Sequence, residues 1–304
     1  MPGLAWVFGP GENSGHSFTV SGEGMVARQL LAEYWLGQEV PLPGWTFYQS
    51  RQPNRQLESI AVEIGDLGRV DTETMLIEAT VDAELEVLDI VAWHPLFAKI
   101  SEEHRAQMLF LLLDETLGEF GTQTWIGGIE IEQVDAEKVD GRTAHRLMDL
   151  PKFINDIKRY HGWEKLSPIR SYTGYSIRAQ QPILRGDTIA GTTCIPRLVF
   201  ELIEEGGRLD EDPLEGTGAE LAYLQIDGAV FPNGDEAGVR HNIEEALEQA
   251  LESDQLGRPL GGAAGTESSY IDLLLIDGNR SRDAVDEAMR RLELRNRYRW
   301  HGFA

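Results

Sequence analysis

Hydrophobic positions along the chain recur at two spacings, one typical of helices and one typical of strands. Apolar residues three or four positions apart predict helices over residues 21–36, 101–117, 196–205, 235–252 and 281–294. Alternating or short continuous apolar runs predict strands over 45–48, 60–64, 74–81, 85–93, 124–131, 171–179, 221–230, 270–276 and 298–303, with 6–8 or 16–20 as a first strand. These elements are grouped rather than strictly alternating. We therefore predict an α+β fold of two small sandwich-like domains in ferredoxin-like style, each with helices on one face of a mostly antiparallel sheet.

Serine and glycine residues predict where several of these helices and strands begin, end or are interrupted. Ser101 is placed to cap the second helix, and Gly118 follows its last turn. Ser21 and Gly37 are placed in the same way around the first helix. The second helix is apolar on most sides and is expected to be buried. The glycine pair at 127–128 interrupts a strand and predicts a bulge or a close approach of two backbones.

The length of the chain favours two domains, because 304 residues exceed what one small core usually holds. A polar stretch over residues 135–165 is predicted to be a helical connector. It separates an N-terminal domain, residues 1–134, from a C-terminal domain, residues 166–304. Apolar residues make up 41% of the chain and charged residues 26%, so long disorder is not expected.

The charge balance narrows the class of partner. The chain has 51 acidic and 27 basic residues, which give a formal net charge of −24. Such a chain repels the phosphates of nucleic acids and anionic membranes at long range. We therefore expect no nucleic acid and no membrane as partner, whereas a basic protein would fit. The charge also fits plain solubility, and it leaves oligomerisation open.

The single cysteine, Cys194, rules out an intrachain disulfide and fits a reducing compartment. No basic segment followed by a long apolar one opens the sequence, so no signal peptide is expected. The densest apolar run, residues 108–113, is too short to cross a bilayer. These features predict a cytoplasmic protein.

One glycine-rich stretch is a candidate anion-binding loop. Gly261, Gly262 and Gly265 would let backbone amides approach an anion closely. However, no Lys-Ser or Lys-Thr pair follows, and the stretch precedes a strand instead of opening a helix. A tight connection between a helix and a strand is the alternative interpretation. We expect no cofactor.

Titratable side chains form no pattern that predicts catalysis or metal binding. The seven histidines include no pair at helical i, i+4 spacing, and His241 with two nearby glutamates resembles a solvated helix face. Cys194 is expected to be an inert thiol. Asp114, Glu115 and Glu119 gather at the end of a predicted helix, where acids are electrostatically unfavourable. We expect no metal site and no catalytic residue.

The C-terminal region is rich in arginine and contains Tyr298 and Trp300. The candidate contact residues there are Arg290, Arg291, Arg295, Arg297 and Arg299. Arginines interleaved with aromatic rings can bind RNA. The preferred alternative is that they pair with acids, either in a second subunit or in the acidic loop that contains Asp210, Glu211 and Asp212.

Several turn and core segments carry a resemblance to other proteins. They are residues 42–48, 113–119, 216–219, 261–265 and 270–273. With these segments the chain resembles an uncharacterised family of bacterial two-domain proteins of unknown function. The resemblance implies a fold and no activity. The element order and acidity of the second half are also loosely similar to the acidic regulator of ribonuclease E activity called B.

The function predicted from these features is that of a cytosolic binding or regulatory protein that acts through protein–protein contact, of inhibitor or immunity type. The acidity and the lack of a catalytic signature favour it. One alternative is an enzyme whose site lies in a cleft between the domains. The other is an RNA-binding protein that uses the arginine-rich C-terminus.

Overall fold

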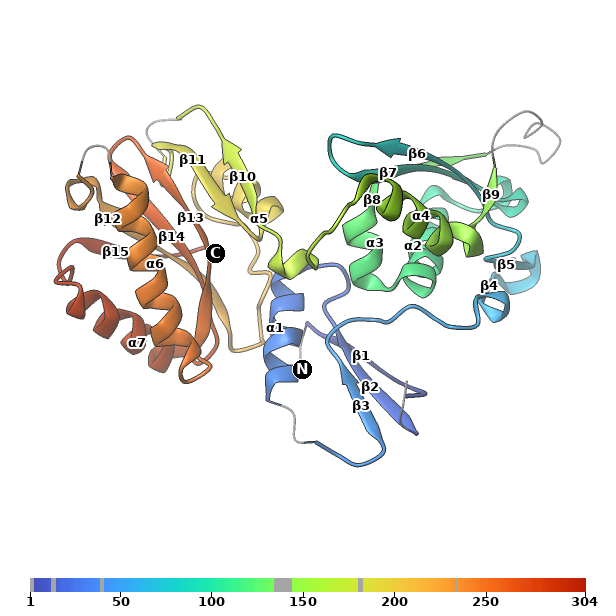
Figure 1. The fold of residues 1–304 in the computed structure, drawn as a ribbon, viewed down its shortest axis with the longest axis horizontal. Coiled ribbons are helices and arrows are strands. Elements are labelled where there is room, and N and C mark those ends of the chain that lie inside the picture. The colour runs from blue at the N-terminus through green and yellow to red at the C-terminus, as the bar shows by residue number, and fades with distance from the viewer. Residues whose placement is uncertain (1–2, 12–14, 39–40, 134–143, 180–182, 233–234) are drawn as a thin grey trace. The chain divides into compact units, whose positions relative to one another are not determined.

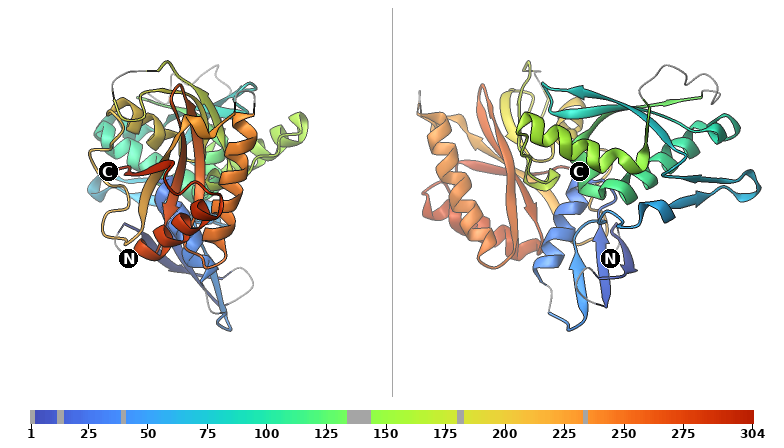
Figure 2. Two further views of the ribbon diagram at one scale, coloured as in Figure 1. Left: turned by 90° about the vertical axis from the view of Figure 1, so that its left-hand side faces the viewer. Right: turned by 45° about the vertical axis from the view of Figure 1, so that its right-hand side comes forward.

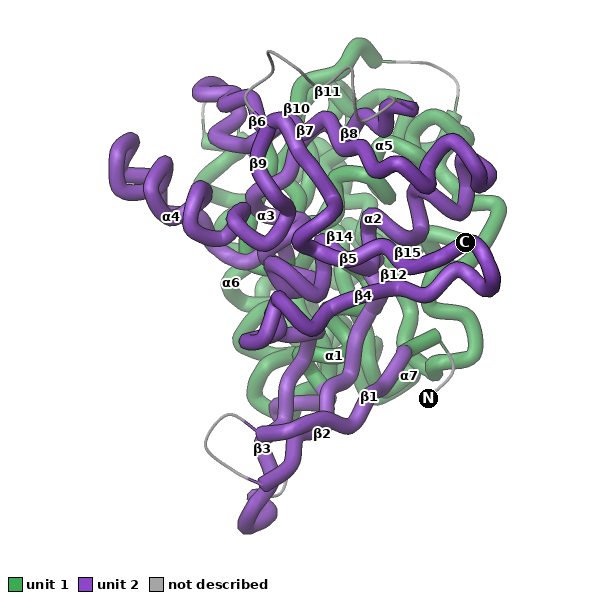
Figure 3. The backbone as a smooth tube through the Cα atoms, turned by 90° about the vertical axis from the view of Figure 1, so that its right-hand side faces the viewer, with its two compact units in different colours: residues 1–4, 26–34, 169–304 green, residues 5–25, 35–168 purple. Residues whose placement is uncertain are grey.

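The computed structural model describes residues 3–11, 15–38, 41–133, 144–179, 183–232 and 235–304. Helices and mostly antiparallel strands follow one another along the chain (Figure 1), which confirms the predicted α+β class. The chain forms two compact units, coloured separately in Figure 3. Unit 1 comprises Met1–Leu4, Val26–Tyr34 and Ile169–Ala304, and unit 2 comprises Ala5–Met25 and Trp35–Pro168.

Unit 1 is built on a six-stranded sheet in which every neighbouring pair is antiparallel. The order is β10-β11-β13-β14-β12-β15. The strands are β10 (Thr173–Ser176), β11 (Thr188–Thr193), β12 (Glu220–Asp227), β13 (Gly257–Gly265), β14 (Ser268–Leu275) and β15 (Tyr298–Gly302). The helices are α5 (Pro196–Glu204), α6 (Glu236–Glu252) and α7 (Gly278–Arg291), together with most of α1 (Val26–Gly37) and the 3₁₀ turns η6 (Pro168–Arg170) and η7 (Gly228–Val230).

Helices α6 and α7 cover one face of this sheet (Figure 1 and Figure 2). Side chains of α6 such as Leu247 pack on alternate residues of the central strands, among them Leu224 and Ile271. The residues between these in the strands point to the opposite face, because successive strand residues alternate. That opposite face carries Tyr223 and Asp272, which are also buried.

Unit 2 contains three smaller sheets with the orders β1-β2-β3, β4-β5 and β8-β7-β6-β9. The strands are β1 (Ala5–Gly9), β2 (His16–Ser21), β3 (Trp45–Tyr48), β4 (Ala61–Glu63), β5 (Arg69–Asp71), β6 (Leu76–Asp82), β7 (Val87–Trp93), β8 (Ile126–Glu132) and β9 (His145–Arg146). The helices are α2 (Glu102–Leu117), α3 (Glu119–Trp125) and α4 (Leu150–His161), with 3₁₀ turns η1 (Leu57–Ser59), η2 (Gly65–Leu67), η3 (Pro95–Lys99) and η5 (Leu147–Asp149).

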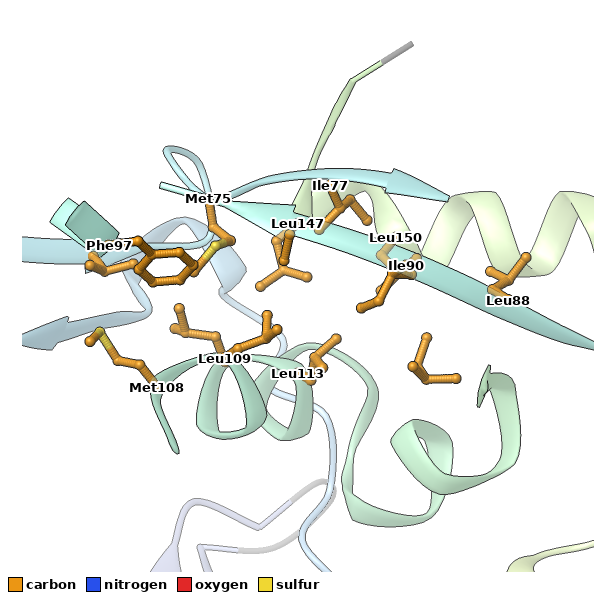
Figure 4. Packing of buried hydrophobic residues seen from close by; sticks show 14 of the residues in the cluster. Met75, Ile77, Leu88, Ile90, Phe97, Met108, Leu109, Leu113, Leu147 and Leu150 are labelled. Atoms are coloured by element: carbon orange, nitrogen blue, oxygen red, sulfur yellow. The ribbon is translucent and has the colours of Figure 1, made fainter. Parts of the chain in front are cut away.

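The core of unit 2 lies between its four-stranded sheet and helix α2. Figure 4 shows Ile77 and Ile90 of the sheet pointing towards Leu109 and Leu113 of the helix. All four side chains are buried. Burial of one such aliphatic side chain stabilises a fold by roughly 1.5–3 kcal/mol, so this layer accounts for the position of α2.

Local signals predicted several boundaries of unit 2 correctly. The hydroxyl of Ser101 accepts a hydrogen bond from the amide of His104 at 3.3 Å, and Gly118 ends the helix at a φ of 75°. The register of β7 and β8 shifts opposite Gly127, which confirms the bulge. A Cβ atom at Gly127 would lie 2.6 Å from a methyl carbon of Val87, so only glycine fits there.

Other predictions for the N-terminal half were wrong. Ser21 lies in β2 and caps no helix, since α1 begins at Val26 after an uncapped Met25. Trp125 belongs to the short helix α3, whereas the apolar pattern predicts a strand there. Helix α2 is only half-buried, because Phe110 and Leu111 on its outer side are exposed. The apolar run of α2 thus overstated its burial.

The chain passes between the units after Leu4, Met25, Tyr34 and Pro168, and the last of these points lies beyond the predicted connector, residues 135–165. Helix α4 lies within that stretch, and residues 134–143 fall outside the described part. Across the described ranges, no helix combines the length and the apolar character that crossing a membrane requires.

Candidate functional site

The three-stranded sheet of unit 2 gathers aromatic side chains on one face. In the register of the strands, Phe8 lies opposite Phe18, which lies opposite Phe47. Residues paired in this way share a face, and so do residues two apart along a strand. The same face therefore carries a set that we call the aromatic face: Trp6, Phe8, His16, Phe18, Trp45 and Phe47.

The rings of the aromatic face touch one another across the strands. Phe8 lies 5.1 Å from Phe18 and 5.8 Å from Trp45, measured between ring centroids. Trp35, near the end of α1, packs on the same face at 5.3 Å from Phe18 and 5.9 Å from Phe47. Edge-to-face and tilted pairs of this kind each contribute about 0.5–1.5 kcal/mol beyond burial. The contacts hold the rings in fixed positions.

A large part of the aromatic face is open to solvent. Trp6 is 62% exposed and Phe8 is 60% exposed, and His16 is exposed as well. Val7, between the first two, is 49% exposed on the opposite face of the strand. Single exposed apolar residues are common, but a contiguous apolar patch usually marks an interaction site.

The strands that form the aromatic face carry no Asp, Glu, Lys or Arg. The chain as a whole has a net charge of −24, so these uncharged strands differ from the rest of the sequence. Aromatic enrichment with loss of charge is typical of the centre of a protein–protein interface. Binding of single-stranded nucleic acid pairs aromatic rings with basic side chains, which these strands lack.

Comparisons with known proteins give no family for this chain. No protein-family model matches it, and no curated protein or solved structure is significantly similar to it. The resemblance to a family of bacterial two-domain proteins stays a prediction. The role of the aromatic face is therefore inferred from its geometry.

A second cluster, of polar side chains, lies in the interior of unit 1. Arg185 donates two hydrogen bonds to the carboxylate of Asp272, and both side chains are fully buried. The guanidinium carbon of Arg185 lies 5.2 Å from the ring centroids of both Tyr223 and Tyr270. Burial alone would lower the pKa of Arg185, but the ion pair with Asp272 raises it above its usual value. The arginine stays charged inside the protein.

Asp187 completes this polar cluster. Its carboxylate accepts hydrogen bonds from the hydroxyl of Tyr270 and from the amides of Glu267 and Ser268, the amides at 3.0 and 2.9 Å. Burial, followed by this hydrogen bond to Asp187, raises the pKa of Tyr270, and burial raises the pKa of Tyr223 to about 12. The tyrosines therefore stay protonated at neutral pH, and the arginine and both carboxylates are already paired with one another or with backbone and hydroxyl groups. The cluster is a structural network.

A shallow pocket of about 370 Å³ lies near the turn between β13 and β14. Phe231, Arg240 and Ser269 line it together with small residues of the hairpin. The Nε atom of Arg240 lies 3.4 Å from Glu244 Oε1 along α6. Burial raises the pKa of Glu244, and Arg240 opposes that shift. The pocket thus combines an arginine that is paired with Glu244 and the two acids Glu236 and Glu267.

The predicted anion-binding loop is a strand. Gly261, Gly262 and Gly265 belong to β13, in the interior of the six-stranded sheet. A Cβ atom at Gly261 would lie 2.1 Å from the carbonyl oxygen of Thr192, and one at Gly262 would lie 2.4 Å from that of Tyr270. These glycines allow neighbouring strands to approach closely. Their amides do not surround an open loop, and the anion-loop prediction is wrong for this reason.

The arginine-rich end is exposed, and several of its members pair with acids of the same unit. Arg290 and Arg291 both contact Glu287, and Arg297 contacts Asp227 at 3.1 Å. The two guanidinium groups hold the pKa of Glu287 at about 2. Arg295 is exposed near the turn that precedes β15. Burial, with a smaller contribution from Arg299 of β15, lowers the pKa of His301.

The acidic loop uses its side chains locally. Asp210, Glu211 and Asp212 are exposed, and Asp212 accepts a hydrogen bond from the amide of Leu214 at 2.9 Å. The partners of Arg290, Arg291 and Arg297 described above lie outside this loop. The sheet face carrying Tyr298 and Trp300 is covered as expected, since both side chains donate hydrogen bonds to Asp286 of α7.

Cys194 is buried at 1% exposure, and burial raises the pKa of its thiol to about 11. The thiol is therefore protonated at neutral pH and is a poor nucleophile. Among the residues that the structure describes, no group of His, Cys, Asp and Glu could hold a metal ion.

The sequence contains a signal for the aromatic face that the predicted elements do not use. Aromatic residues stand two apart at Trp6 and Phe8, at His16 and Phe18, and at Trp45 and Phe47. This spacing predicts one aromatic face on each of three strands. The buried pair Arg185 and Asp272 left no such signal, because its members lie 87 positions apart.

Proposed function

We propose that this protein is a binding protein that contacts another protein through its aromatic face. The observation that carries the proposal is the exposure of Trp6, Phe8 and His16 on a sheet face without charged residues. Exposed tryptophan and phenylalanine would contribute large contact areas at low entropic cost. Rings already held against one another lose little freedom on binding, which favours affinity.

The remaining candidate sites support other functions less well. The polar cluster around Arg185 is fully buried and offers no group to a substrate. Several arginines of the C-terminal end already pair with carboxylates, which opposes phosphate binding. A binding role needs neither a catalytic residue nor a cofactor.

The net charge adds a preference for a basic partner. A chain of −24 attracts a positively charged protein at long range and raises the rate of association at low salt. The apolar centre would then hold the complex after encounter. Association should therefore slow down with added salt, whereas dissociation should change little.

The test uses two substitutions on the aromatic face, away from the edge strand β1. Trp45→Ser removes a half-buried ring, and His16→Glu places a charge on the exposed part of the face. Tyr160→Glu is the matched control, because Tyr160 is 84% exposed on α4 and lies outside the face. Proteins retained by the wild-type chain from its native lysate are identified and purified, and their Kd is measured by calorimetry.

We expect both face variants to raise the Kd at least about tenfold and the control to leave it unchanged, in line with the loss of an interface anchor. Circular dichroism and thermal unfolding verify that the variants stay folded. A partner that binds both face variants as tightly as the wild-type chain would contradict the proposal. Retention of small molecules without any protein would favour an enzyme.

A further inference from the structure

Strand β1 forms an open edge of the three-stranded sheet. It pairs with β2 on one side, and in the described sheet order no strand follows on the other. Edge strands are usually protected by a charged residue, a proline or a bulge. The sequence Ala5-Trp6-Val7-Phe8-Gly9 contains no charge and no proline, and its register with β2 runs without a shift. Its three central residues are all exposed.

We infer that a second copy of this chain pairs with β1 in antiparallel orientation, with the two-fold axis at Val7. The order of side chains in β1 is small, aromatic, branched, aromatic, small, and it reads alike in both directions. Antiparallel pairing about Val7 places Trp6 opposite the partner's Phe8 and Ala5 opposite the partner's Gly9. Val7 meets its own copy. An isologous contact needs such self-complementarity.

The charge distribution favours a second copy at this edge. Two chains of −24 repel each other wherever their acidic surfaces meet. The strands β1, β2 and β3 contain no Asp, Glu, Lys or Arg, so pairing along β1 places no like charges at the contact. A partner with basic contact residues would find no carboxylate on this strand to pair with. The cross-strand pairs are aromatic with aromatic, which stabilise a sheet.

Pairing along β1 joins two three-stranded sheets into one sheet of six strands. Trp6 and the partner's Phe8 lie on the same face, so each copy contributes rings to the aromatic face of the other. The combined face is larger and two-fold symmetric. Its use for a partner protein rests on the proposed function, whereas the pairing itself does not.

The exposed area predicts a weak and reversible dimer. Trp6 and Phe8 expose 62% and 60% of their surfaces. With roughly 200 Å² per ring, the four rings of a dimer offer roughly 500 Å². Stable complexes bury about 1,200–2,000 Å² in total, so the edge alone supports association at micromolar or higher concentration. The measurement must therefore cover a wide range of concentration.

Sedimentation velocity between about 1 and 300 µM tests the pairing. We expect a shift from monomer to dimer in the wild-type chain and at least a tenfold rise of the dimer Kd in Val7→Lys. Leu85→Lys is the matched control, since Leu85 is 67% exposed on a turn of the same unit, and it should dimerise like the wild type. A wild-type chain that stays monomeric throughout, or a dimer that Val7→Lys leaves intact, would overturn the inference.

Disulfide trapping tests the register. In the proposed dimer the two Val7 residues face each other at roughly 5 Å between Cα atoms, which a disulfide can bridge. The two Ala5 residues lie about 14 Å apart along the strands. Mild oxidation should therefore link Val7→Cys at least tenfold faster than Ala5→Cys, and native Cys194, at 1% exposure, should not interfere. Equal rates for the two variants would refute pairing about Val7.

These tests separate the pairing from the proposed function. His16→Glu should lose the partner protein and keep the dimer, because His16 lies on β2 away from the edge. Val7→Lys should lose the dimer, while its monomer still carries the face that binds the partner. Loss of both properties in both variants would mean that edge and face do not act independently, which would refute this arrangement.

Discussion

Charged side chains are usually exposed and aromatic side chains are usually buried, and two sheets of this protein depart from this rule in opposite ways. They are the six-stranded sheet of unit 1 and the three-stranded sheet of unit 2. The larger sheet buries a charged pair, Arg185 and Asp272, at 0% exposure. The smaller sheet exposes Trp6 and Phe8 by more than half. The interior normally holds the rings and the surface normally holds the charges. The buried ion pair and the exposed rings therefore need separate explanations.

Buried charge persists in unit 1 because the carboxylate oxygens of Asp272 and the two terminal guanidinium nitrogens of Arg185 pair with each other. Both carboxylate oxygens of Asp272 accept from Arg185, and two tyrosine rings flank the guanidinium group. The exposed rings of Trp6 and Phe8 in unit 2 pack against each other and against Phe18, and more than half of each side chain remains in contact with water. The first exception serves the fold, and we expect the second to serve binding.

The largest expected effect concerns the buried ion pair. Asp272→Ala leaves the charge of Arg185 without a partner and should lower the free energy of unfolding by about 3–5 kcal/mol. Denaturant titration followed by circular dichroism measures the change. The double variant Arg185→Met with Asp272→Leu should cost less than the single one, because no unpaired charge remains. A loss below about 1 kcal/mol for Asp272→Ala would contradict a buried, paired charge.

A buried carboxylate in unit 2 extends the comparison to an acid that accepts hydrogen bonds from a hydroxyl and from backbone amides. Glu119 is 1% exposed and accepts from the hydroxyl of Ser21 and from the amides of Gly24 and Arg51, at 2.7, 3.1 and 3.3 Å. Glu119→Gln turns one acceptor oxygen into a donor and should cost about 1.5–3 kcal/mol. The same titration measures it. Glu287→Gln on the solvated surface is the control and should change stability little, because exposed ion pairs contribute little to stability.

Two tryptophans test the claim that the aromatic face is not a core. Trp6→Ser should lower the free energy of unfolding by about 1–2 kcal/mol, because most of the side chain is already in water and the ring contacts with Phe8 and Phe18 are the main loss. Trp93→Ser, with a ring that is 2% exposed, should cost about 3–5 kcal/mol. Thermal and denaturant unfolding of the two variants provide the comparison. Equal losses would mean that Trp6 is buried in solution.

The smallest expected effect depends on pH. Burial raises the pKa of Asp114 above its usual 3.8, and nearby Glu119 adds to this shift. The folded state then binds the proton more tightly than the unfolded state, so stability falls as pH rises from 3.8 through the folded pKa. Asp114→Asn should therefore raise the free energy of unfolding at pH 7, and this gain should vanish near pH 3. A gain that is the same at both pH values would exclude the ionised carboxylate as its cause.

Predictions from the sequence succeeded where the deciding interaction is local. The hydroxyl of Ser101 and the positive φ of Gly118 act within one helical turn, so their positions in the sequence predict the ends of α2. The apolar spacing over residues 235–252 predicted helix α6 in the same way, and Ile243, Leu247 and Leu251 of this spacing are buried. Predictions from the sequence missed strands β11 and β13. These strands contain small residues in place of the usual branched ones, and their conformation is explained only by pairing with neighbouring strands.

By itself the sequence determined the α+β class, most helices, the charge of −24 and the aromatic spacing along β1, β2 and β3. The tertiary structure alone decided that Arg185 meets Asp272 and that Trp6 and Phe8 face solvent. Caps and periodicity act over a few residues and are written in the local sequence. Whether a polar or aromatic side chain is covered depends on segments many residues away, and an alternating aromatic strand fits a core and an interface equally well.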